Sequence, residues 1–279
     1  MKLQTLLGCA LVAWTMTASL FAHGDLHEQI EAVTALIAKE PVNADLILKR
    51  AELHRAHEEW AAALADYDRV DPLAPGRTSL SRGLVLLAQG KAREALAPLN
   101  ECLRAMPGHF EALVARGRAR VQLRELAGAV ADFDRAIELS RVFDPDVFLE
   151  RARALTADEP PKLDEAARGL AEAIRRAGAV PSLGLALCDI EVQRGRFDDA
   201  LALIDKLRAR SPRQETWLAR RGEILLKAGQ PGEAADAFRA ALAAIHSLPP
   251  RLRQTQMTRE LEAKLGQQLA QLSAPEAQR

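Results

Sequence analysis

The small and large apolar residues of this chain follow one pattern that recurs along most of its length. An Ala is followed four positions later by a large apolar residue, and such pairs occur at Ala63/Tyr67, Ala95/Leu99, Ala129/Phe133, Ala166/Leu170, Ala200/Ile204 and Ala234/Phe238. Successive Ala residues of these pairs are 32, 34, 37, 34 and 34 positions apart. Self-similarity at such a regular period predicts a repeat architecture, in which each unit is one supersecondary element.

A second small residue precedes the Ala of every pair. It stands twelve positions earlier in five units and fourteen positions earlier in the fourth unit, where Glu159-Pro160-Pro161 predicts a longer turn. These small residues are Ala51, Gly83, Gly117, Ala152, Cys188 and Gly222. We interpret each unit as two antiparallel helices that approach closely at the two small residues, with the large residue filling the space beside them. One helix pair cannot bury its apolar face alone, so the units are expected to stack.

The period and these residues resemble the tetratricopeptide repeat family. The closest matches are Ala129-x-x-x-Phe133 after Arg116-Gly117 and Ala234-x-x-x-Phe238 after Arg221-Gly222, and the resemblance covers about residues 43–247. It implies an all-α fold, a right-handed α-solenoid of about six helix-turn-helix repeats with helical caps at both ends. The expected repeats are residues 43–75, 76–109, 110–144, 145–180, 181–214 and 215–248, within an array of residues 43–248. The resemblance also implies a module that binds another protein, although the Lys and Asn pattern with which some members clamp a carboxyl-terminal peptide is absent.

Where the family often has Leu before the first small residue, this chain has an Arg in five units and Leu187 in the fifth. The arginines of this column are Arg50, Arg82, Arg116, Arg151 and Arg221. One reading is a positive stripe for an anionic ligand. We favour a structural reading, because Asp66 and Asp132 stand on the facing helix sixteen residues after Arg50 and Arg116, and a partly buried Arg needs such a partner.

Helices that cap both ends of the array are indicated by single apolar stripes. Leu26, Ile30, Val33 and Ile37 define an amino-terminal capping helix within residues 23–42. Beyond Pro249-Pro250, a carboxyl-terminal capping helix within residues 249–273 is indicated by Met257, Leu261, Leu265, Leu269 and Leu272. Residues 274–279 are expected to be a disordered tail.

The first helices of stacked pairs line the concave side of a solenoid, which predicts a groove for an extended or helical protein segment. The repeat phase assigns to it Leu48, Glu52, Arg55, Leu80, Leu84, Leu87, Val114, Arg118, Val121, Leu149, Arg153, Thr156, Leu185, Asp189, Val192, Ala219, Glu223 and Leu226. Apolar contacts would supply affinity there, and the Arg and acidic side chains would orient the ligand.

The amino terminus predicts export. Met1 and Lys2 precede an uncharged stretch from Leu3 to Ala22, with an apolar middle and small residues at its end, which is typical of a secretory signal peptide over residues 1–22. An uncleaved anchor is the alternative, since about 20 residues can just span a bilayer. A lipoprotein processing box at Leu6-Leu7-Gly8-Cys9 is a third reading, which lies very near the start. We therefore expect a periplasmic or secreted protein that contacts a membrane only if this segment stays uncleaved.

Composition supports helices and excludes a polyanion partner. Hydrophobic residues make up 48% and aromatic residues 4% of the chain, a balance typical of packed helices rather than β-sandwiches. With 38 basic and 38 acidic side chains, nothing favours binding to nucleic acid. After removal of residues 1–22, Cys102 and Cys188 would remain, three repeats apart and too distant for a disulfide, so both are interpreted as small buried residues in helix contacts.

Histidines suggest one specific chemical hypothesis. Cleavage after Ala22 would make His23 the new amino terminus, where its α-amino group and imidazole could chelate copper, with His27 as a further ligand. A copper-handling accessory protein is therefore the alternative function. The simpler interpretation is that His23 and His27 are solvated side chains without a ligand. His54 and His57 share one helix face, but no cluster of further metal ligands stands near them in the sequence.

No motif for catalysis is present: there is no G-x-S-x-G, phosphate-binding glycine loop, H-E-x-x-H or C-x-x-C. We expect a non-catalytic scaffold without a cofactor.

Overall fold

The computed structural model describes residues 25–178 and 180–273, and every regular element in these ranges is an α-helix. The all-α fold class is therefore confirmed. The predicted signal peptide, His23 and the predicted tail at 274–279 lie outside the described residues. The chain divides into two compact units, Met1–Leu139 and Ser140–Arg279, each of which is described by itself.

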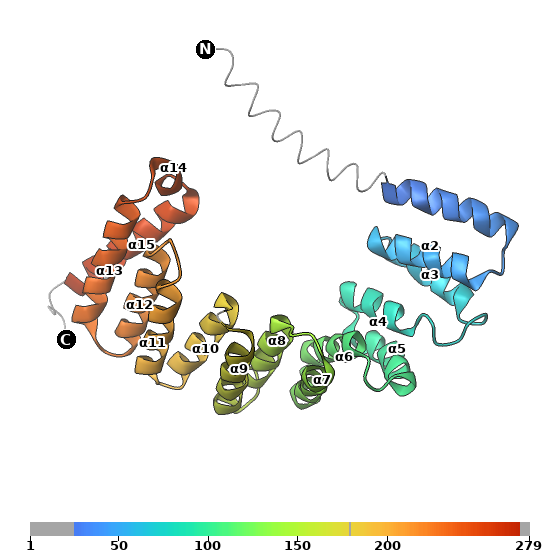
Figure 1. The fold of residues 1–279 in the computed structure, drawn as a ribbon, viewed down its shortest axis with the longest axis horizontal. Helices are drawn as coiled ribbons and strands as arrows, with labels where there is room; N and C mark the ends of the chain where they lie inside the picture. Colours follow the sequence, from blue (N-terminus) through green and yellow to red (C-terminus); the bar gives the residue numbers. More distant parts are fainter. Residues whose placement is uncertain (1–24, 179, 274–279) are drawn as a thin grey trace, which may run out of the picture. The chain divides into compact units, whose positions relative to one another are not determined.

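The first unit contains a helix over residues 25–39 followed by three antiparallel helix pairs (Figure 1). Their helices are α2 (Ala44–Ala56), α3 (Trp60–Val70), α4 (Ser79–Ala88), α5 (Ala92–Ala105), α6 (Phe110–Gln122) and α7 (Leu126–Leu139). Each odd-numbered helix packs on the helix before it, and α5 also packs on α6 of the next pair. These pairs correspond to the first three expected repeats.

The second unit contains three further pairs and two terminal helices (Figure 1). They are α8 (Pro145–Thr156), α9 (Leu163–Ala177), α10 (Pro181–Gln193), α11 (Phe197–Arg208), α12 (Glu215–Lys227), α13 (Pro231–His246), α14 (Pro250–Arg253) and α15 (Gln256–Ser273). The pairs stack through α9 on α10 and α11 on α12, and α15 covers α13.

The turn inside most pairs is closed by a residue in the left-handed region. Gly90, Gly195 and Gly229 have φ of 74°, 73° and 75°, and the non-glycine residues Glu58 and Arg124 have φ of 61° at the same place in their units. At Gly90, the N–H donates to the Leu87 carbonyl, and the next N–H donates to the carbonyl five residues earlier. This arrangement satisfies carbonyls at the end of the first helix, so the chain can reverse within three residues.

The predicted contact between small and large residues forms the core of every pair. All six Ala residues of the pattern, and the six large residues that follow them, have 0% of their surface exposed. A Cβ built on Gly117 would lie 2.6 Å from the Phe133 ring, and one built on Gly83 would lie 2.6 Å from Leu99. The large side chain of the second helix therefore occupies the space that a side chain on the first helix would need, as the sequence predicted.

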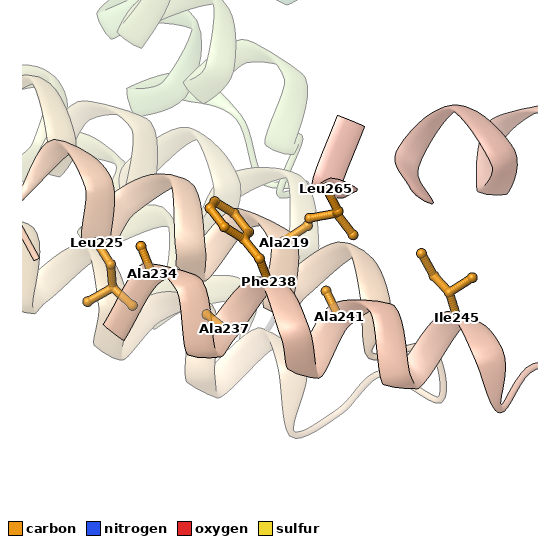
Figure 2. Close-up of a cluster of buried hydrophobic side chains, with 8 residues drawn as sticks. All are labelled: Ala219, Leu225, Ala234, Ala237, Phe238, Ala241, Ile245 and Leu265. Atoms are coloured by element: carbon orange, nitrogen blue, oxygen red, sulfur yellow. The ribbon is translucent and has the colours of Figure 1, made fainter. Parts of the chain in front are cut away.

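The residues of both terminal stripes are buried or partly buried, with one exception. Ile30, Val33 and Ile37 of the first helix are buried, as predicted. Figure 2 shows the core cluster that α15 covers, with Leu265 beside α13 residues that include Phe238 and Ile245. Met257 was predicted to belong to this contact and is instead 71% exposed.

The stripe of α15 starts one residue later than predicted. Thr258 is 1% exposed, and its hydroxyl lies 2.9 Å from the Thr255 hydroxyl. Positions 257 and 258 both continue the helical spacing of Leu261 and Leu265, so periodicity alone does not choose between them. Local hydrogen bonding at the start of the helix satisfies the Thr side chain and allows its burial.

All five arginines of the column pair with carboxylates, which supports the structural reading. Arg50 Nη2 lies 2.7 Å from Asp66 Oδ1, and Arg116 Nη2 lies 2.6 Å from Asp132 Oδ1, so both predicted pairs are present. The hydrogen bond to Asp66 raises the pKa of Arg50. The remaining pairs are Arg82 with Asp68 and Asp71, Arg151 with Glu165, and Arg221 with Asp205.

Candidate functional site

The predicted groove residues of the first unit are partly engaged with one another. Glu52 Oε2 accepts a hydrogen bond from Arg55 Nε at 2.7 Å, and Glu52 Oε1 accepts one from the buried Tyr67 hydroxyl at 2.9 Å. Burial would raise the pKa of Glu52, but hydrogen bonds from Ser81, Arg55 and Tyr67 outweigh it and lower this pKa. Burial, together with the neighbouring Glu52 charge, raises the pKa of Tyr67. This network holds a carboxylate in a fixed place between α2, α3 and α4.

The apolar groove residues of the first unit also pack against its hydrophobic core. Leu80, Leu84 and Leu87 are partly buried against the cluster that contains Leu99. Leu48 packs on the cluster that contains Tyr67. On α6, Arg118 is exposed and Val121 is intermediate, whereas Val114 is 5% exposed and so presents little surface to a ligand.

In the second unit, predicted groove residues lie around one cavity between α8 and α10. The cavity has a volume of about 360 Å³ and is lined by Leu149, Ala152, Arg153, Thr156, Ser182, Leu185, Ala186, Asp189, Ile190 and Gln193. Arg153 and Asp189 are exposed, Thr156 and Leu185 are intermediate, and Leu149 is 9% exposed. Five of the ten lining residues were predicted groove residues and five were not, among them the polar Ser182 and Gln193. These two stand seven residues before and four after Asp189, a helical spacing that would have placed them on the same face.

A chain of ion pairs continues from this cavity across α12 to α15. Arg220 pairs with Asp189 and with Glu223, whose Oε2 lies 2.9 Å from Arg220 Nη1. Lys264 Nζ of α15 lies 2.6 Å from Glu223 Oε1. Burial would raise the pKa of Glu223, but hydrogen bonds from Lys264 and Arg220 lower it. Asp189 and Glu223 were predicted ligand contacts, whereas Arg220 and Lys264 were not predicted.

The remaining groove residues of the second unit lie along the same helices. Val192 is partly buried against the core cluster that contains Cys188 and Ile204, and Leu226 against the cluster that contains Phe238. Ala219 is 5% exposed. The surface of α8, α10 and α12 thus combines a polar-rimmed cavity with side chains of both charges that are already paired.

Both described cysteines are free and buried, so their interpretation as small packing residues is confirmed. Cys188 Sγ lies 3.7 Å from the Ala200 carbonyl oxygen, at the close approach of α10 and α11. Burial raises the pKa of Cys188 to about 11 and also raises that of Cys102.

The histidines within residues 25–178 and 180–273 do not form a metal site. His27 Nε2 lies 3.3 Å from Glu31 Oε1, and its side chain is 65% exposed. Within residues 25–178 and 180–273, no group of three or more His, Cys, Asp or Glu side chains is arranged to hold a metal ion. The copper hypothesis depends on His23, outside these ranges, and stays a prediction. His54 and His57 both contact Glu59, at 2.5 Å and 2.9 Å.

In the part of the chain that the structure describes, no helix has the length and hydropathy needed to cross a bilayer.

Stacked helix pairs with small residues at their crossings define a helical-repeat protein. The family model for the tetratricopeptide repeat matches residues 19–78, 80–142 and 185–248. The chain therefore belongs to the tetratricopeptide repeat family. Residues 143–184, which fall outside the match, include the fourth repeat with its longer turn.

Known proteins agree with this assignment. The chain is 31% identical over 212 residues to human tetratricopeptide repeat protein 34, a match that covers 67% of this chain and 36% of that protein. The chain thus spans about a third of that relative. A tetratricopeptide repeat protein from Parabacteroides merdae has a similar structure, with a TM-score of 0.56, 22% identity and coverage of 90% and 96% of the two chains. The carboxyl-terminal part of a repeat-containing protein from Cytophaga hutchinsonii gives a TM-score of 0.67 at 15% identity, covering 88% of this chain and 98% of that one.

Proposed function

We propose that this protein is an exported, non-catalytic scaffold that binds a segment of another protein on the first helices of its repeats. The family membership supports a role in protein interaction. The observation that carries the proposal is the cavity between α8 and α10, where Leu149 and Leu185 offer apolar surface and Arg153 and Gln193 offer polar groups at the rim. Such a mixture suits a side chain of a protein ligand, with the polar groups fixing its orientation.

The ion pairs beside this cavity support a preformed binding surface. Because Arg220 is held between Asp189 and Glu223, the charged side chains near the ligand have lost much of their freedom before binding. Preorganised side chains lower the entropic cost of association, so an interface of moderate area can still bind its ligand with appreciable affinity. The ligand would therefore meet a fixed pattern of charge rather than mobile side chains.

Site-specific photocrosslinking in cells tests this proposal. A photoreactive amino acid at Gln193, on the rim of the cavity, is expected to capture a discrete protein partner, which mass spectrometry then identifies. The matched control carries the same amino acid at Arg168, an exposed residue of α9 that does not line the cavity. Leu185→Ser in the Gln193 background should remove the captured product. Equal capture from Gln193 and Arg168, or capture unaffected by Leu185→Ser, would place the binding surface elsewhere.

Export is part of the same proposal and rests on the sequence of residues 1–22. Amino-terminal sequencing of the protein recovered from the exported fraction is expected to begin at His23. Recovery of the protein only in the cytosolic fraction with Met1 retained would overturn this part. Such a result would leave the protein-binding proposal to the crosslinking experiment.

A further inference from the structure

A second cavity lies at the ends of α9, α10 and α11, and the proposed function makes no use of it. Its volume is about 400 Å³, and it is lined by Ile174, Gly178, Val180, Gly184, Leu203, Lys206, Leu207, Ala209 and Arg210. It shares no lining residue with the cavity between α8 and α10. The two cavities can therefore be altered independently.

The first cause of this cavity is a missing side chain in the fifth repeat. Gly184 stands four residues before the small residue Cys188. The corresponding residues of the other repeats are Ile47, Ser79, Leu113, Phe148 and Leu218. Four of these five are large, and Ile47, Leu113 and Phe148 are 1%, 3% and 6% exposed. The fifth repeat thus has no side chain where most of its neighbours bury a bulky one.

The second helix of the fifth repeat compensates only in part. Leu207 stands nineteen residues after Cys188, the small residue of the fifth repeat. In the fourth repeat the same position comes twenty-one residues after Ala152, because its turn has two extra residues. The counterparts of Leu207 in the other repeats are Val70, Cys102, Ala136, Ala173 and Ala241. All five counterparts are buried, whereas Leu207 is partly exposed. A Cβ on Gly184 would lie 3.1 Å from Leu207 Cδ2, so the Leu207 side chain packs directly against the glycine. The order of large and small residues is therefore inverted, and the inverted pair does not fill the space.

The chemistry of the lining combines an apolar interior with two cations. Ile174, Val180, Leu203 and Leu207 supply the apolar surface. Lys206 and Arg210 are exposed, and within residues 25–178 and 180–273 neither forms an ion pair. This contrasts with the five arginines of the column, which all pair with carboxylates. An apolar ligand with one negative charge would complement both parts of the cavity.

We infer that this cavity binds a small amphiphilic carboxylate of the medium-chain fatty-acid class, with its chain against Leu203 and Leu207 and its carboxylate between Lys206 and Arg210. The volume lies within the range of about 300–1,000 Å³ that is usual for small-molecule sites. A small molecule fits better than a protein segment, because the space is confined to the ends of three consecutive helices. Burial of the chain supplies most of the affinity, and the two cations select for the negative charge.

Isothermal titration calorimetry with decanoate, decanol and decylamine tests this inference on the full chain. Decanoate is expected to bind saturably, with decanol weaker and decylamine weaker still. In Lys206→Gln/Arg210→Gln, decanoate affinity should fall by about fivefold, since two solvent-exposed ion pairs are lost, while decanol affinity stays unchanged. This difference between the two ligands separates the role of the charge from that of the apolar interior.

A filled cavity provides the matched control. Gly184→Leu/Leu207→Ala restores the order of large and small residues that the third and sixth repeats have at these positions, so it should retain the helical content and thermal stability of the parent chain. It should also lose binding of decanoate and decanol by at least about tenfold, while Arg153→Gln, at the other cavity, should leave binding unchanged. Absence of saturable decanoate binding by the parent chain would overturn the inference. Unchanged binding by the folded double variant would overturn it as well, by placing the ligand elsewhere on the chain.

Discussion

Gly117 of α6 lies directly against the ring of Phe133 of α7, so that a Cβ on Gly117 would come within 2.6 Å of the ring carbon Cε1. Phe133 is fully buried, and the ring is enclosed by the helix pair that it joins. Real Cβ atoms do not tolerate such a distance, and an enclosed ring has little space to retreat. The glycine is therefore required by the aromatic residue sixteen positions later.

Gly117→Leu is expected to destabilise the protein by several kcal/mol, because the new side chain must separate α6 from α7 or displace the ring. Urea unfolding followed by circular dichroism measures this loss. Gly266→Ala is the matched control, since nothing lies within 4 Å of a Cβ at this position of α15. Replacing an exposed helical glycine by Ala should stabilise by about 0.5–1 kcal/mol. Equal effects at both positions would contradict the assigned contact.

Arg116→Leu is expected to cost about 2–4 kcal/mol, because it removes a partner from a buried carboxylate. Asp132 is 3% exposed and accepts hydrogen bonds from Arg116 Nε at 3.0 Å and from Arg120 Nη1 at 2.7 Å. The fifth repeat has Leu187 and Leu203 at the corresponding positions, so an apolar pair is compatible with the fold.

The double variant Arg116→Leu/Asp132→Leu should therefore be more stable than Arg116→Leu alone. A double-mutant cycle by urea unfolding checks this expectation. Strictly additive losses would mean that the two side chains act independently, contrary to the structure.

Glu223 should make the attachment of α15 sensitive to acid. Its pKa in the folded protein lies below the ordinary value of 4.5, so its contribution to stability is present above this pH and is lost as the pH falls through the lowered pKa. Glu223→Gln should lower the melting temperature at pH 7, and the difference from the parent chain should shrink as the solution becomes more acidic than pH 4.5. Lys264→Met should behave in the same way, because it removes the cation that pairs with Glu223. A difference that stays constant from pH 7 to pH 3 would exclude this role.

The thiols of Cys102 and Cys188 should resist alkylation in the folded protein. Burial raises the pKa of Cys188 to about 11, so almost no thiolate is present at pH 8, and both side chains are covered. Iodoacetamide treatment followed by peptide mass spectrometry is expected to label both residues only after urea is added. Rapid labelling of Cys188 in native buffer would show that α10 and α11 open readily.

The groove could be anticipated only in part. Helical spacing placed Leu149, Arg153 and Asp189 on one surface, and the structure shows that all three line one cavity, because residues at the same phase of neighbouring repeats lie side by side. Helical spacing also assigned Val114 to the groove, but this residue is buried in the structure. Periodicity places a residue on one face of a helix and does not say how closely the next helix covers that face. Arg220 was not predicted because its partner Asp189 lies on α10, 31 residues earlier in the chain. Its second partner, Glu223, stands three residues later on α12, a helical spacing that the sequence does show.

The repeat, the helix pairs and the contacts within each pair all follow from the order of residues along the chain. Gly117 with Phe133 and Arg116 with Asp132 could both be read from the sequence, because helices joined by a short turn meet at a nearly constant separation along the chain. The tertiary structure decided the contacts between repeats, such as Arg221 with Asp205 of the preceding pair and Lys264 with Glu223. It also decided where packing is incomplete, as at Gly184 and Leu207, since an unfilled volume depends on how neighbouring side chains share the space in three dimensions.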